Sequence, residues 1–480
     1  MTVTLLGGEM LQWSDLDGTH GPAPVGSPGA ASGPGPALRP LLGAVTGRTL
    51  VAGPHAPELI EALTTGAVTV LARGLADAEA LDAKLDVTVW AGSLEKVAAT
   101  PTFDTIVALD GLDRLCSVEA ETLDGWDQRL THLLALLRPG GRLLLGLENL
   151  FGLHRLLALP GALGDDDWLV PDDRDPRRPA TLAALRDRLA AAGLSTERSY
   201  AAYNGVLLSP ELLANRDLNG FLSATLATAT ADFSGEHLAD PATLAAQALR
   251  HGLATDLAPS WIVVTDRGAA TSHTPEAVIG GRPVTATDLP RGRTLEDLLF
   301  AAAQQRDLPT MRTLLSTWQN SPAAGVPAAQ IVIDPSGALT ALAPAGDPLV
   351  ALRRFAASAI EAGLAHVWPA PADELELTTI IAGMTGRELD PADVPPLPPR
   401  PTPGAVRELT ATRDRLAREL AEARAKHAFY EQQIRSRDAE LKRVRQINAV
   451  LTATTPGKAV IGSLKAGRRA VRAVVKRGRS

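Results

Sequence analysis

Two residues, Asp110 and His154, have side chains that can move protons, and they carry the first functional hypothesis. Asp110 follows an apolar run, Phe103–Ala108, that predicts a buried strand. Ligands of α/β sheets bind outside the carboxyl ends of the strands, where Asp110 would stand. His154 is the second candidate because histidine is the most frequent general base. Each has a competing interpretation: a helix N-cap for Asp110 and a surface histidine for His154.

Short apolar runs that alternate with Ala/Leu-rich segments must position these residues. The runs predict strands at Thr49–Ala52, Val68–Ala72, Val87–Ala91, Phe103–Ala108, Arg142–Leu147 and Ser260–Thr265. The segments between them predict helices at Pro57–Thr64, Leu75–Lys84, Asp127–Leu137 and Thr181–Ala192. Strands separated by helix-length segments indicate βαβ units. We therefore predict an α/β fold with a doubly wound, mostly parallel sheet.

Composition and charge exclude several classes of protein. The single cysteine, Cys116, rules out an internal disulfide and a cysteine metal cluster, so a reduced, cytoplasmic setting is expected. The first residues, MTVTLLGGEMLQW, lack the features of a signal peptide, and no run approaches the roughly 18 apolar residues of a membrane span. Residues 401–480 carry 19 Lys and Arg against 7 Asp and Glu, so the net charge of −7 divides into −19 for residues 1–400 and +12 for the rest. An acidic body argues against nucleic acid binding there.

Two breaks divide the chain. Residues 18–36 hold six Gly and five Pro, and residues 395–403 hold six Pro in nine positions, which favours an extended spacer. The predicted organisation has six parts: a flexible leader (1–39), a Rossmann-like domain (40–267), a smaller α/β segment (268–392), a Pro-rich linker (393–404), a long coiled-coil helix (405–453) and a basic amphipathic tail (454–480).

The segment from Phe103 to Leu147 resembles class I S-adenosylmethionine (SAM) methyltransferases. Phe103-Asp104-Thr105-Ile106-Val107 is similar to the entry into their fourth strand, and Leu136-Leu137-Arg138-Pro139-Gly140-Gly141-Arg142-Leu143-Leu144-Leu145 is similar to the helix end and fifth strand. Pro139 would stop the helix and the two glycines would make the turn. A generic helix–turn–strand of another doubly wound fold is the alternative.

The following residues resemble a subtype of this family, the methyltransferases of cell-surface polysaccharide pathways. Glu148-Asn149-Leu150-Phe151-Gly152-Leu153-His154-Arg155-Leu156 is similar to their "EN–G–HRL" continuation, and Thr181, Ala192-Gly193-Leu194 and Tyr200-Ala201-Ala202-Tyr203 follow in the family's order. The resemblance covers roughly residues 40–267. It implies SAM as cofactor and a glycan or small-molecule acceptor.

The same resemblance assigns the cofactor contacts to Gly53, Asp77, Ser93 and Leu109, and three of these positions depart from the family pattern. The loop after the first strand keeps one glycine, Gly53, between Ala52 and Pro54. The second strand ends in Arg73 instead of an acid, with Asp77 four residues on, and Ser93 replaces the acid after the third strand. Each lost charge-assisted hydrogen bond costs about 1.5–3 kcal/mol. We expect the cofactor to bind weakly or not at all.

Residues 268–392 resemble a degenerate kinase-like fold. Residues 327–339 predict strand–turn–strand with Pro335-Ser336-Gly337 as the turn, similar to a metal-binding segment of kinase-like folds. Gln330 and Ala343 stand where that pattern has Asn and Asp. No phosphate loop or catalytic Asp motif precedes it, so kinase activity is not predicted. An unrelated small α/β cap is the alternative.

From Leu409 to Leu451 apolar residues recur with the a/d spacing of a coiled coil over about six heptads. Asn448 at an a-type position suits a parallel homodimer through residues 409–451, whereas Arg413, His427 and Arg437 weaken the seam. A long, solvated single helix is the alternative.

Residues 456–480 carry eight basic and no acidic residues, with valines, Ile461 and Leu464 at largely helical spacing. Such a segment can lie on an anionic membrane, and it lacks the aromatic residues that stack on nucleic acid bases. A solvated tail is the alternative.

Two functions follow from these patterns. The first is a SAM-dependent methyltransferase-like protein of glycan or surface-polysaccharide metabolism, with a degenerate cofactor site. The second is a catalytically inactive scaffold of the same fold that dimerises and organises partner enzymes at the inner face of the membrane. Loss of the cofactor anchors favours the scaffold, and Asp110 with Glu148-Asn149 favours the enzyme.

Overall fold

The computed structural model describes residues 3–17, 35–43, 45–63, 67–117, 125–158, 175–231, 233, 237–268, 274–364, 367, 374–397, 403–453, 459 and 462–469. The chain divides into two compact units, Met1–Pro403 and Gly404–Ser480, and each is considered by itself.

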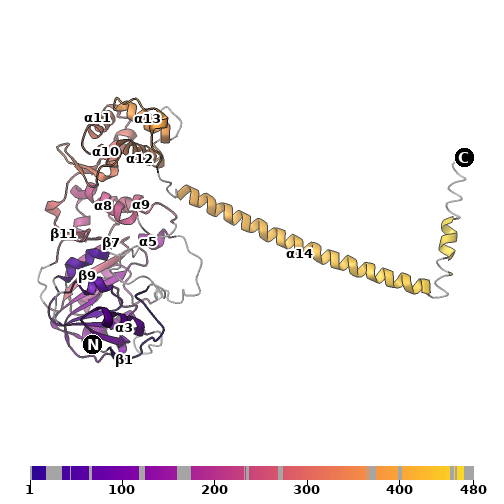
Figure 1. The fold of residues 1–480 in the computed structure, drawn as a ribbon, viewed down its shortest axis with the longest axis horizontal. Helices are drawn as coiled ribbons and strands as arrows, with labels where there is room; N and C mark the ends of the chain where they lie inside the picture. Colours follow the sequence, from indigo (N-terminus) through magenta and orange to yellow (C-terminus); the bar gives the residue numbers. More distant parts are fainter. Residues whose placement is uncertain are drawn as a thin grey trace. The chain divides into compact units, whose positions relative to one another are not determined.

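The described part of the first unit is built on an eleven-stranded sheet of order β1-β4-β3-β2-β5-β6-β9-β7-β8-β10-β11. Figure 1 labels β1, β7, β9 and β11 of this sheet. The strands from β1 to β6 are parallel to one another. They are β1 (Thr4–Gly7), β2 (Thr49–Ala52), β3 (Val68–Ala72), β4 (Thr88–Gly92), β5 (Phe103–Ala108) and β6 (Leu137–Glu148). The remaining strands pair antiparallel: β7 (Ser195–Tyr203), β8 (Val206–Leu208), β9 (Ser260–Asp266), β10 (Ala277–Ile279) and β11 (Arg282–Val284).

The predicted α/β fold is confirmed, and each predicted strand is present. Three strands, β2, β3 and β5, have the predicted bounds, and β6 begins before its predicted start at Arg142. The prediction of a mostly parallel sheet holds only from β1 to β6. In the other half, tight turns join β7 to β8 and β10 to β11, and strands joined in this way must pair antiparallel. The β10–β11 turn, for example, is Gly280-Gly281, both with positive φ, which suits a tight hairpin. The strand β9 inserts antiparallel between β6 and β7.

Helices cover both faces of the sheet. In the first 267 residues they are α1 (Arg39–Leu42), α2 (Pro57–Ile60), α3 (Leu75–Lys84), α4 (Trp126–Ala135), α5 (Leu153–Leu156), α6 (Leu182–Ala191), α7 (Pro210–Leu213), α8 (Asn219–Ala231) and α9 (Pro241–Arg250). Neighbouring strand residues enter different cores: Ile106 and Leu143 pack in one cluster, and Val107 and Leu144 pack in the other. Burial on both faces explains why these strands read as continuous apolar runs.

The prediction of a flexible leader over residues 1–39 is wrong for the described part of that range. Thr4–Gly7 forms the edge strand β1, parallel to β4, and Met10 forms a bridge to Gly74. Residues 35–38 form a short 3₁₀ helix in which Leu38 is fully buried. The Gly/Pro-rich residues 18–34 lie outside the described residues.

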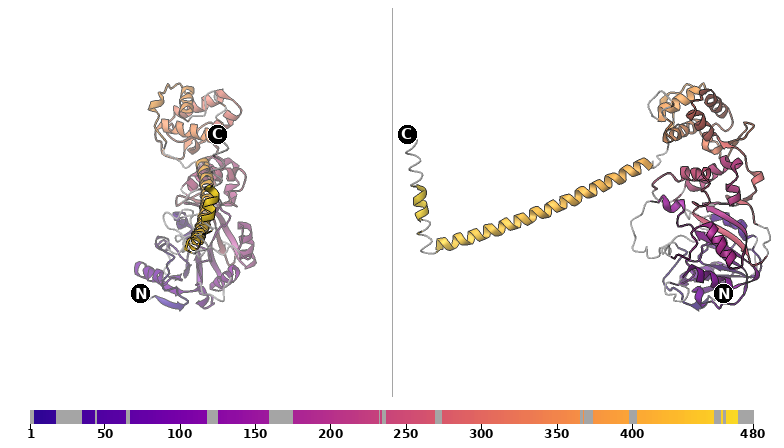
Figure 2. Two further views of the ribbon diagram at one scale, coloured as in Figure 1. Left: turned by 90° about the vertical axis from the view of Figure 1, so that its right-hand side faces the viewer. Right: turned by 180° about the vertical axis from the view of Figure 1, so that it is seen from behind.

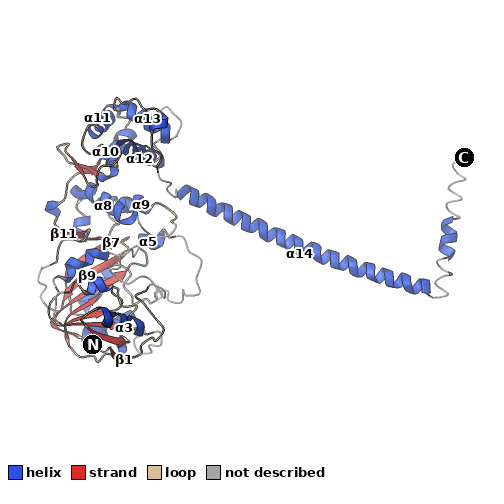
Figure 3. Ribbon diagram, viewed as in Figure 1, coloured by secondary structure: helices blue, strands red, loops and turns tan. Residues whose placement is uncertain are grey.

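Residues 293–389 form a second, smaller core. It combines β12 (Arg293–Thr294), β13 (Ile331–Ile333) and β14 (Leu339–Ala341) with α10 (Leu295–Gln304), α11 (Leu308–Gln319), α12 (Pro348–Glu361) and α13 (Glu374–Met384). Figure 3 shows α8 and α9 between the large sheet and this part, and Figure 2 shows the same region from two further sides. The strands β10 and β11, which follow residue 268, continue the large sheet, so the predicted domain boundary at residue 268 is wrong. The predicted strand–turn–strand at 327–339 corresponds to β13 and β14.

The second unit consists mainly of α14 (Pro403–Ala453), one helix of 51 residues that includes the predicted coiled-coil range. Of the predicted linker, residues 398–402 lie outside the described residues. Most of the predicted tail does too, although residues 462–469 are helical. No helix within the described residues is both long enough and apolar enough to cross a membrane.

Candidate active site

The strand order of the sheet reverses between β2 and β5, which is where α/β folds bind ligands. From β2 the chain runs through β3 and β4 on one side, and β5 and β6 lie on the other. The predicted site residues Gly53, Ser93, Leu109 and Asp110 follow the carboxyl ends of β2, β4 and β5. Arg73 follows β3 and Glu148 ends β6. The fold therefore brings the predicted residues to one edge, which we call the carboxyl edge.

Gly53 has a backbone conformation that favours glycine, but protein atoms occupy the space where its side chain would be. Its φ is +90°, a conformation that residues with a Cβ rarely adopt. A Cβ built at this position would lie 3.2 Å from Cδ2 of Leu115 and 4.0 Å from Cβ of Asp110. The space that a glycine leaves for close approach of a ligand is thus filled by the loop after β5.

His55 joins the loop after β2 to the loop after β5. Its Nε2 accepts the backbone N–H of Leu109 at 3.2 Å, so the proton is on Nδ1, which donates to the carbonyl of Gly53 at 3.0 Å. The residue is 1% exposed, and burial lowers the pKa of the imidazole to about 4, so it is neutral at pH 7. Leu109 was predicted to contact a cofactor, but its N–H is bonded to His55 of the protein itself.

Arg73 is paired with a carboxylate from the N-terminal segment. Its Nε and Nη2 each donate to Asp15 at 2.8 Å, and both side chains are 4% exposed. A third bond reaches the carbonyl of Cys116 at 3.2 Å, and the guanidinium lies 5.4 Å from the centroid of a Trp13 ring. Burial opposes the charge on Asp15, but Arg73 keeps its pKa below the ordinary value. Sequence analysis missed Asp15, since nothing local marks a partner 58 residues away.

Asp77, predicted to replace the missing ribose-binding acid, also contacts the N-terminal segment. It accepts the hydroxyl of Ser14 and, at 2.7 Å, the backbone N–H of Asp15. Burial raises its pKa above the ordinary value despite these bonds. Both of its oxygens are thus engaged by protein donors.

We call residues 10–17 the N-terminal strap. Met10 donates its N–H to the carbonyl of Arg73 at 2.8 Å and accepts the N–H of Leu75 at 3.1 Å. Asp15 also lies 3.8 Å from Arg114, which follows β5. Because β2 lies between β3 and β5, a carboxylate that reaches both Arg73 and Arg114 lies across the carboxyl end of β2. Gly74 permits this course, since a Cβ there would lie 2.5 Å from the carbonyl oxygen of Trp13.

Asp110, the first predicted proton-transfer residue, forms an ion pair. Arg114 Nε donates to it at 2.8 Å, and Arg114 Nη2 also contacts it. Burial raises the pKa of Asp110 to about 6, although Arg114 lowers it. No helix begins at Asp110 within residues 109–117, so the N-cap interpretation is wrong.

Ser93 is fully buried and also bonds within the protein. Its hydroxyl accepts the N–H of Ser117 at 3.0 Å, which ties the end of β4 to the loop after β5.

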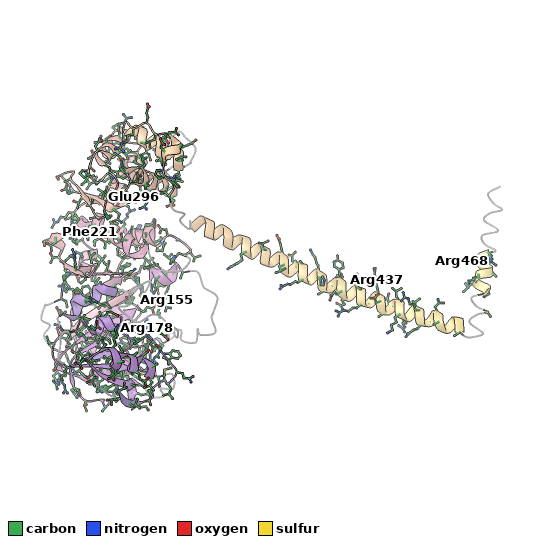
Figure 4. The ribbon with its side chains drawn as sticks, in the orientation of Figure 1. Arg155, Arg178, Phe221, Glu296, Arg437 and Arg468 are labelled. Carbon is green, nitrogen blue, oxygen red and sulfur yellow. The ribbon has the colours of Figure 1, made fainter. Side chains whose placement is uncertain are left out.

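His154, the second predicted proton-transfer residue, lies beside Glu148 at the end of β6. Its Nε2 is 3.1 Å from Glu148 Oε1, which also accepts Nε of Arg155 at 2.8 Å. Burial opposes the charge on Glu148, but the bonds from His154 and Arg155 lower its pKa to about 2. The His154 side chain is 13% exposed, so it is not a surface histidine. Arg178 donates to the Glu148 carbonyl at 2.9 Å, and Figure 4 shows Arg155 and Arg178 near one another.

Asn149, next along the family-like motif, has a structural role. Its amide donates to the carbonyls of Asp256 and Ala258 at 2.7 and 2.8 Å, and its oxygen accepts the N–H of Phe151. His154 lies on the segment that begins at Asn149. These bonds attach that segment to the residues before β9.

The residues of the carboxyl edge do not fit SAM as they stand. A ribose would need an acid at the end of β3, where the buried Arg73–Asp15 pair stands, and the cofactor would have to displace His55 from Leu109. Breaking a buried pair costs about 3–5 kcal/mol, and a further buried hydrogen bond about 1–3 kcal/mol. No methyl-transfer step is derived from this arrangement.

In the smaller α/β part, the described residues of the kinase-like pattern bond to protein groups. Asp334 caps the β13–β14 turn, where Oδ1 accepts the N–H groups of Ser336 and Ala338 at 2.8 and 2.9 Å. Gln330, at the position of a metal-binding Asn in the kinase-like pattern, donates to Thr228 of α8 at 3.1 Å. Among the residues that the structure describes, no group of three or more His, Cys, Asp or Glu could hold a metal ion.

No protein-family model and no curated protein matches the chain. Solved structures with a similar fold include the S-adenosylmethionine-dependent methyltransferase from Mesorhizobium loti, at 17% identity over 48% of this chain and 98% of that chain, with a TM-score of 0.27. The [4+2]-cyclase SpnF matches at 15% identity over 52% and 89%, with a TM-score of 0.28. The N-methyltransferase NodS from Bradyrhizobium japonicum, solved with S-adenosyl-L-homocysteine, matches at 19% identity over 23% and 58%, with a TM-score of 0.19.

Proposed function

We propose that this chain is a catalytically inactive, methyltransferase-like scaffold of glycan or surface-polysaccharide metabolism. The observation that carries the proposal is the buried ion pair between Asp15 and Arg73, which stands at the predicted ribose-binding position. His55 and Leu115 fill the neighbouring positions after β2 and β5. An edge that is closed by the chain's own side chains favours a role for the fold other than catalysis.

The pathway part of the proposal rests on sequence resemblance. Residues 148–156 and the motifs after them are similar to methyltransferases of cell-surface polysaccharide pathways. The scaffold would organise partner enzymes as a homodimer through residues 409–451, with residues 456–480 on an anionic membrane at the cytoplasmic side. Nucleic acid is not expected as a partner, because residues 1–400 are strongly acidic.

A second candidate, an active SAM-dependent methyltransferase, is favoured by one observation. Asp110, Glu148 and His154 converge at the ends of the neighbouring strands β5 and β6, where an acceptor hydroxyl of a glycan or small molecule would lie. In this candidate the N-terminal strap has to leave the edge before the cofactor can enter.

Calorimetric titration of SAM into the full chain separates the two candidates. The scaffold predicts no saturable binding up to millimolar SAM for the wild type and for Gly74→Ala, whose added Cβ would contact the Trp13 carbonyl and loosen the strap. Micromolar affinity in the wild type would contradict the scaffold. Binding that emerges only in Gly74→Ala would instead support an enzyme held closed by its strap.

The membrane contact has its own test. Flotation with vesicles that contain anionic lipid should recover the full chain, and a chain ending at residue 455 should stay with the soluble fraction. Equal flotation of both would contradict a role for residues 456–480.

A further inference from the structure

The helix α14 exposes a regular series of large apolar side chains. Within residues 413–449, whose exposure is described for most positions, Leu420, Ile434 and Leu441 are 51%, 59% and 52% exposed, and Leu416 and Val444 are 56% and 61% exposed. Leu420, Ile434 and Leu441 lie whole heptads apart, Leu416 and Val444 do too, and the two sets are offset from each other by three or four residues. This is the a/d spacing of a coiled-coil seam. A helix that presents such a stripe gains stability by burying it against another helix.

The heptad register places every residue of this range. Position a is occupied by Arg413, Leu420, His427, Ile434, Leu441 and Asn448, and position d by Leu416, Ala423, Tyr430, Arg437 and Val444. Positions e and g flank this seam and determine which partner and orientation are favoured. Position g holds Glu419, Lys426, Gln433 and Glu440, and position e holds Arg424, Glu431, Asp438 and Arg445.

The flanking charges complement a second, identical helix. In a parallel, in-register pair each g residue faces the e residue five positions later on the other helix. This rule joins Glu419 to Arg424, Lys426 to Glu431 and Glu440 to Arg445, each a pair of opposite charge. It also joins Gln433 to Asp438, which do not repel one another. Positions 419–445 therefore contain no like-charged g–e pair.

The polar seam residues fit the same arrangement. In register, Asn448 of one helix faces Asn448 of the other, where two amides can bond. In an antiparallel pair an a residue faces a d residue of the other helix, and no d position of this range holds an asparagine, so Asn448 would lose that partner. Arg413, His427 and Arg437 face their own copies and lower the affinity, so the dimer is of moderate strength.

We propose that α14 binds a second copy of this chain in parallel and in register, specified by the g–e pairs Glu419–Arg424, Lys426–Glu431 and Glu440–Arg445. The proposal deepens the homodimer part of the proposed function. Its test does not involve SAM or partner enzymes, so the two can fail separately. The alternative is that these charges stabilise a single helix through pairs within it, such as the contact of Arg435 with Glu431 at 3.2 Å.

Sedimentation velocity on the full chain tests association. The wild type should sediment as a concentration-dependent dimer, and Ile434→Lys with Leu441→Lys should be monomeric. The control Ser436→Lys with Ala439→Lys adds the same charge outside the seam and should stay dimeric. A monomeric wild type at 100 μM would overturn the proposal.

Charge exchange tests the g–e pairs directly. Glu440→Lys and Arg445→Glu should each weaken dimerisation by about tenfold, as a pair on each side of the dimer becomes repulsive. The double variant should return to within about threefold of the wild type. Arg443→Glu, at a position outside the seam, should change the affinity less than threefold. Failure of the double variant to recover would overturn the pairing.

Disulfide formation tests orientation. Val444→Cys places a thiol at a d position far from the centre of the seam, so oxidised dimers should form rapidly only in a parallel, in-register pair. The wild type controls for Cys116, which is 4% exposed. A stable dimer of Val444→Cys that forms no disulfide would contradict the parallel register.

Discussion

The two halves of the carboxyl edge satisfy their polar residues in different ways. After β2, β3 and β4, the partners come largely from elsewhere in the chain: the N-terminal strap supplies Asp15 and Ser14, and the loop after β5 supplies Leu109 and Ser117. At β5 and β6 the pairs Asp110–Arg114 and Glu148–His154 are local in sequence.

The two halves of the carboxyl edge therefore differ both in their resemblance to the family and in the range of their contacts. The half that resembles a methyltransferase in sequence keeps local pairs at its edge. The half that departs from the methyltransferase pattern has long-range contacts at its edge. Those contacts stabilise the edge without a ligand.

The largest effect is expected at Arg73. Arg73→Ala leaves the buried Asp15 carboxylate without its bidentate partner, so the free energy of unfolding should fall by about 3–5 kcal/mol. Urea denaturation measures it. Arg73→Met with Asp15→Leu should recover more than half of the loss, since apolar residues can replace a buried pair. The exposed pair Arg138–Asp104 is the control, and Arg138→Ala should cost less than about 1 kcal/mol. Equal losses for both arginines would contradict a buried anchor.

His55 should make stability depend on pH. Its pKa in the folded chain, about 4, is below the unfolded value near 6.5, so the unfolded chain binds the proton more readily. The contribution is present above pH 6.5 and is lost as pH falls towards 4, on the order of 3 kcal/mol. Unfolding curves of the wild type and His55→Gln across this window measure it. If the difference between them stays constant with pH, His55 is not buried in the neutral form.

The strap itself can be loosened without changing a charge. Gly74→Ala forces the Trp13 carbonyl to move and should cost about 1–3 kcal/mol. Limited proteolysis should then cut within residues 10–17 more rapidly. Gly383, in α13 with no atom within 4 Å of an added Cβ, is the matched control. Gly383→Ala should stabilise by up to about 1 kcal/mol through helix propensity, so equal losses in both would contradict the strap's close packing.

The smallest effect is expected in the other half of the edge. Glu148→Gln weakens the bonds to His154 and Arg155, yet the Glu148 side chain is 37% exposed and water screens the charge. The loss should be about 1 kcal/mol at pH 7. Because the folded pKa, about 2, is below the unfolded value, the wild-type contribution should disappear as pH falls from 4.5 to 2. A loss as large as that of Arg73→Ala would remove the contrast between the halves.

Much of the fold was predictable because its signals are local. The buried strands β2, β3 and β5 are apolar runs between turn residues, and their bounds were predicted correctly. The strand β1 was missed because it is a four-residue edge strand with Leu5 exposed and a Gly/Pro-rich stretch beyond it. The hairpin of β10 and β11 had a signal that was not used, the pair Gly280-Gly281 between short β-like runs.

The position of the candidate site in the fold was predictable from the sequence, but the contacts that close it were not. The strand ends placed Gly53, Ser93 and Asp110 at one edge, as the order of a doubly wound sheet requires. The contacts that close this edge join residues far apart in sequence, such as Asp15 with Arg73 and His55 with Leu109. Complementary charges at such separations have many potential partners, and only the tertiary arrangement selects among them.

Closure of the carboxyl edge is the central claim, and hydrogen–deuterium exchange of the full chain tests it most directly. The amides of Met10, Asp15 and Leu109 donate to Arg73, Asp77 and His55, so peptides that contain them should be protected. The account predicts that this protection is unchanged by 1 mM SAM. Exchange of residues 10–17 at the rate of an unstructured peptide, or protection that changes when SAM is added, would contradict it.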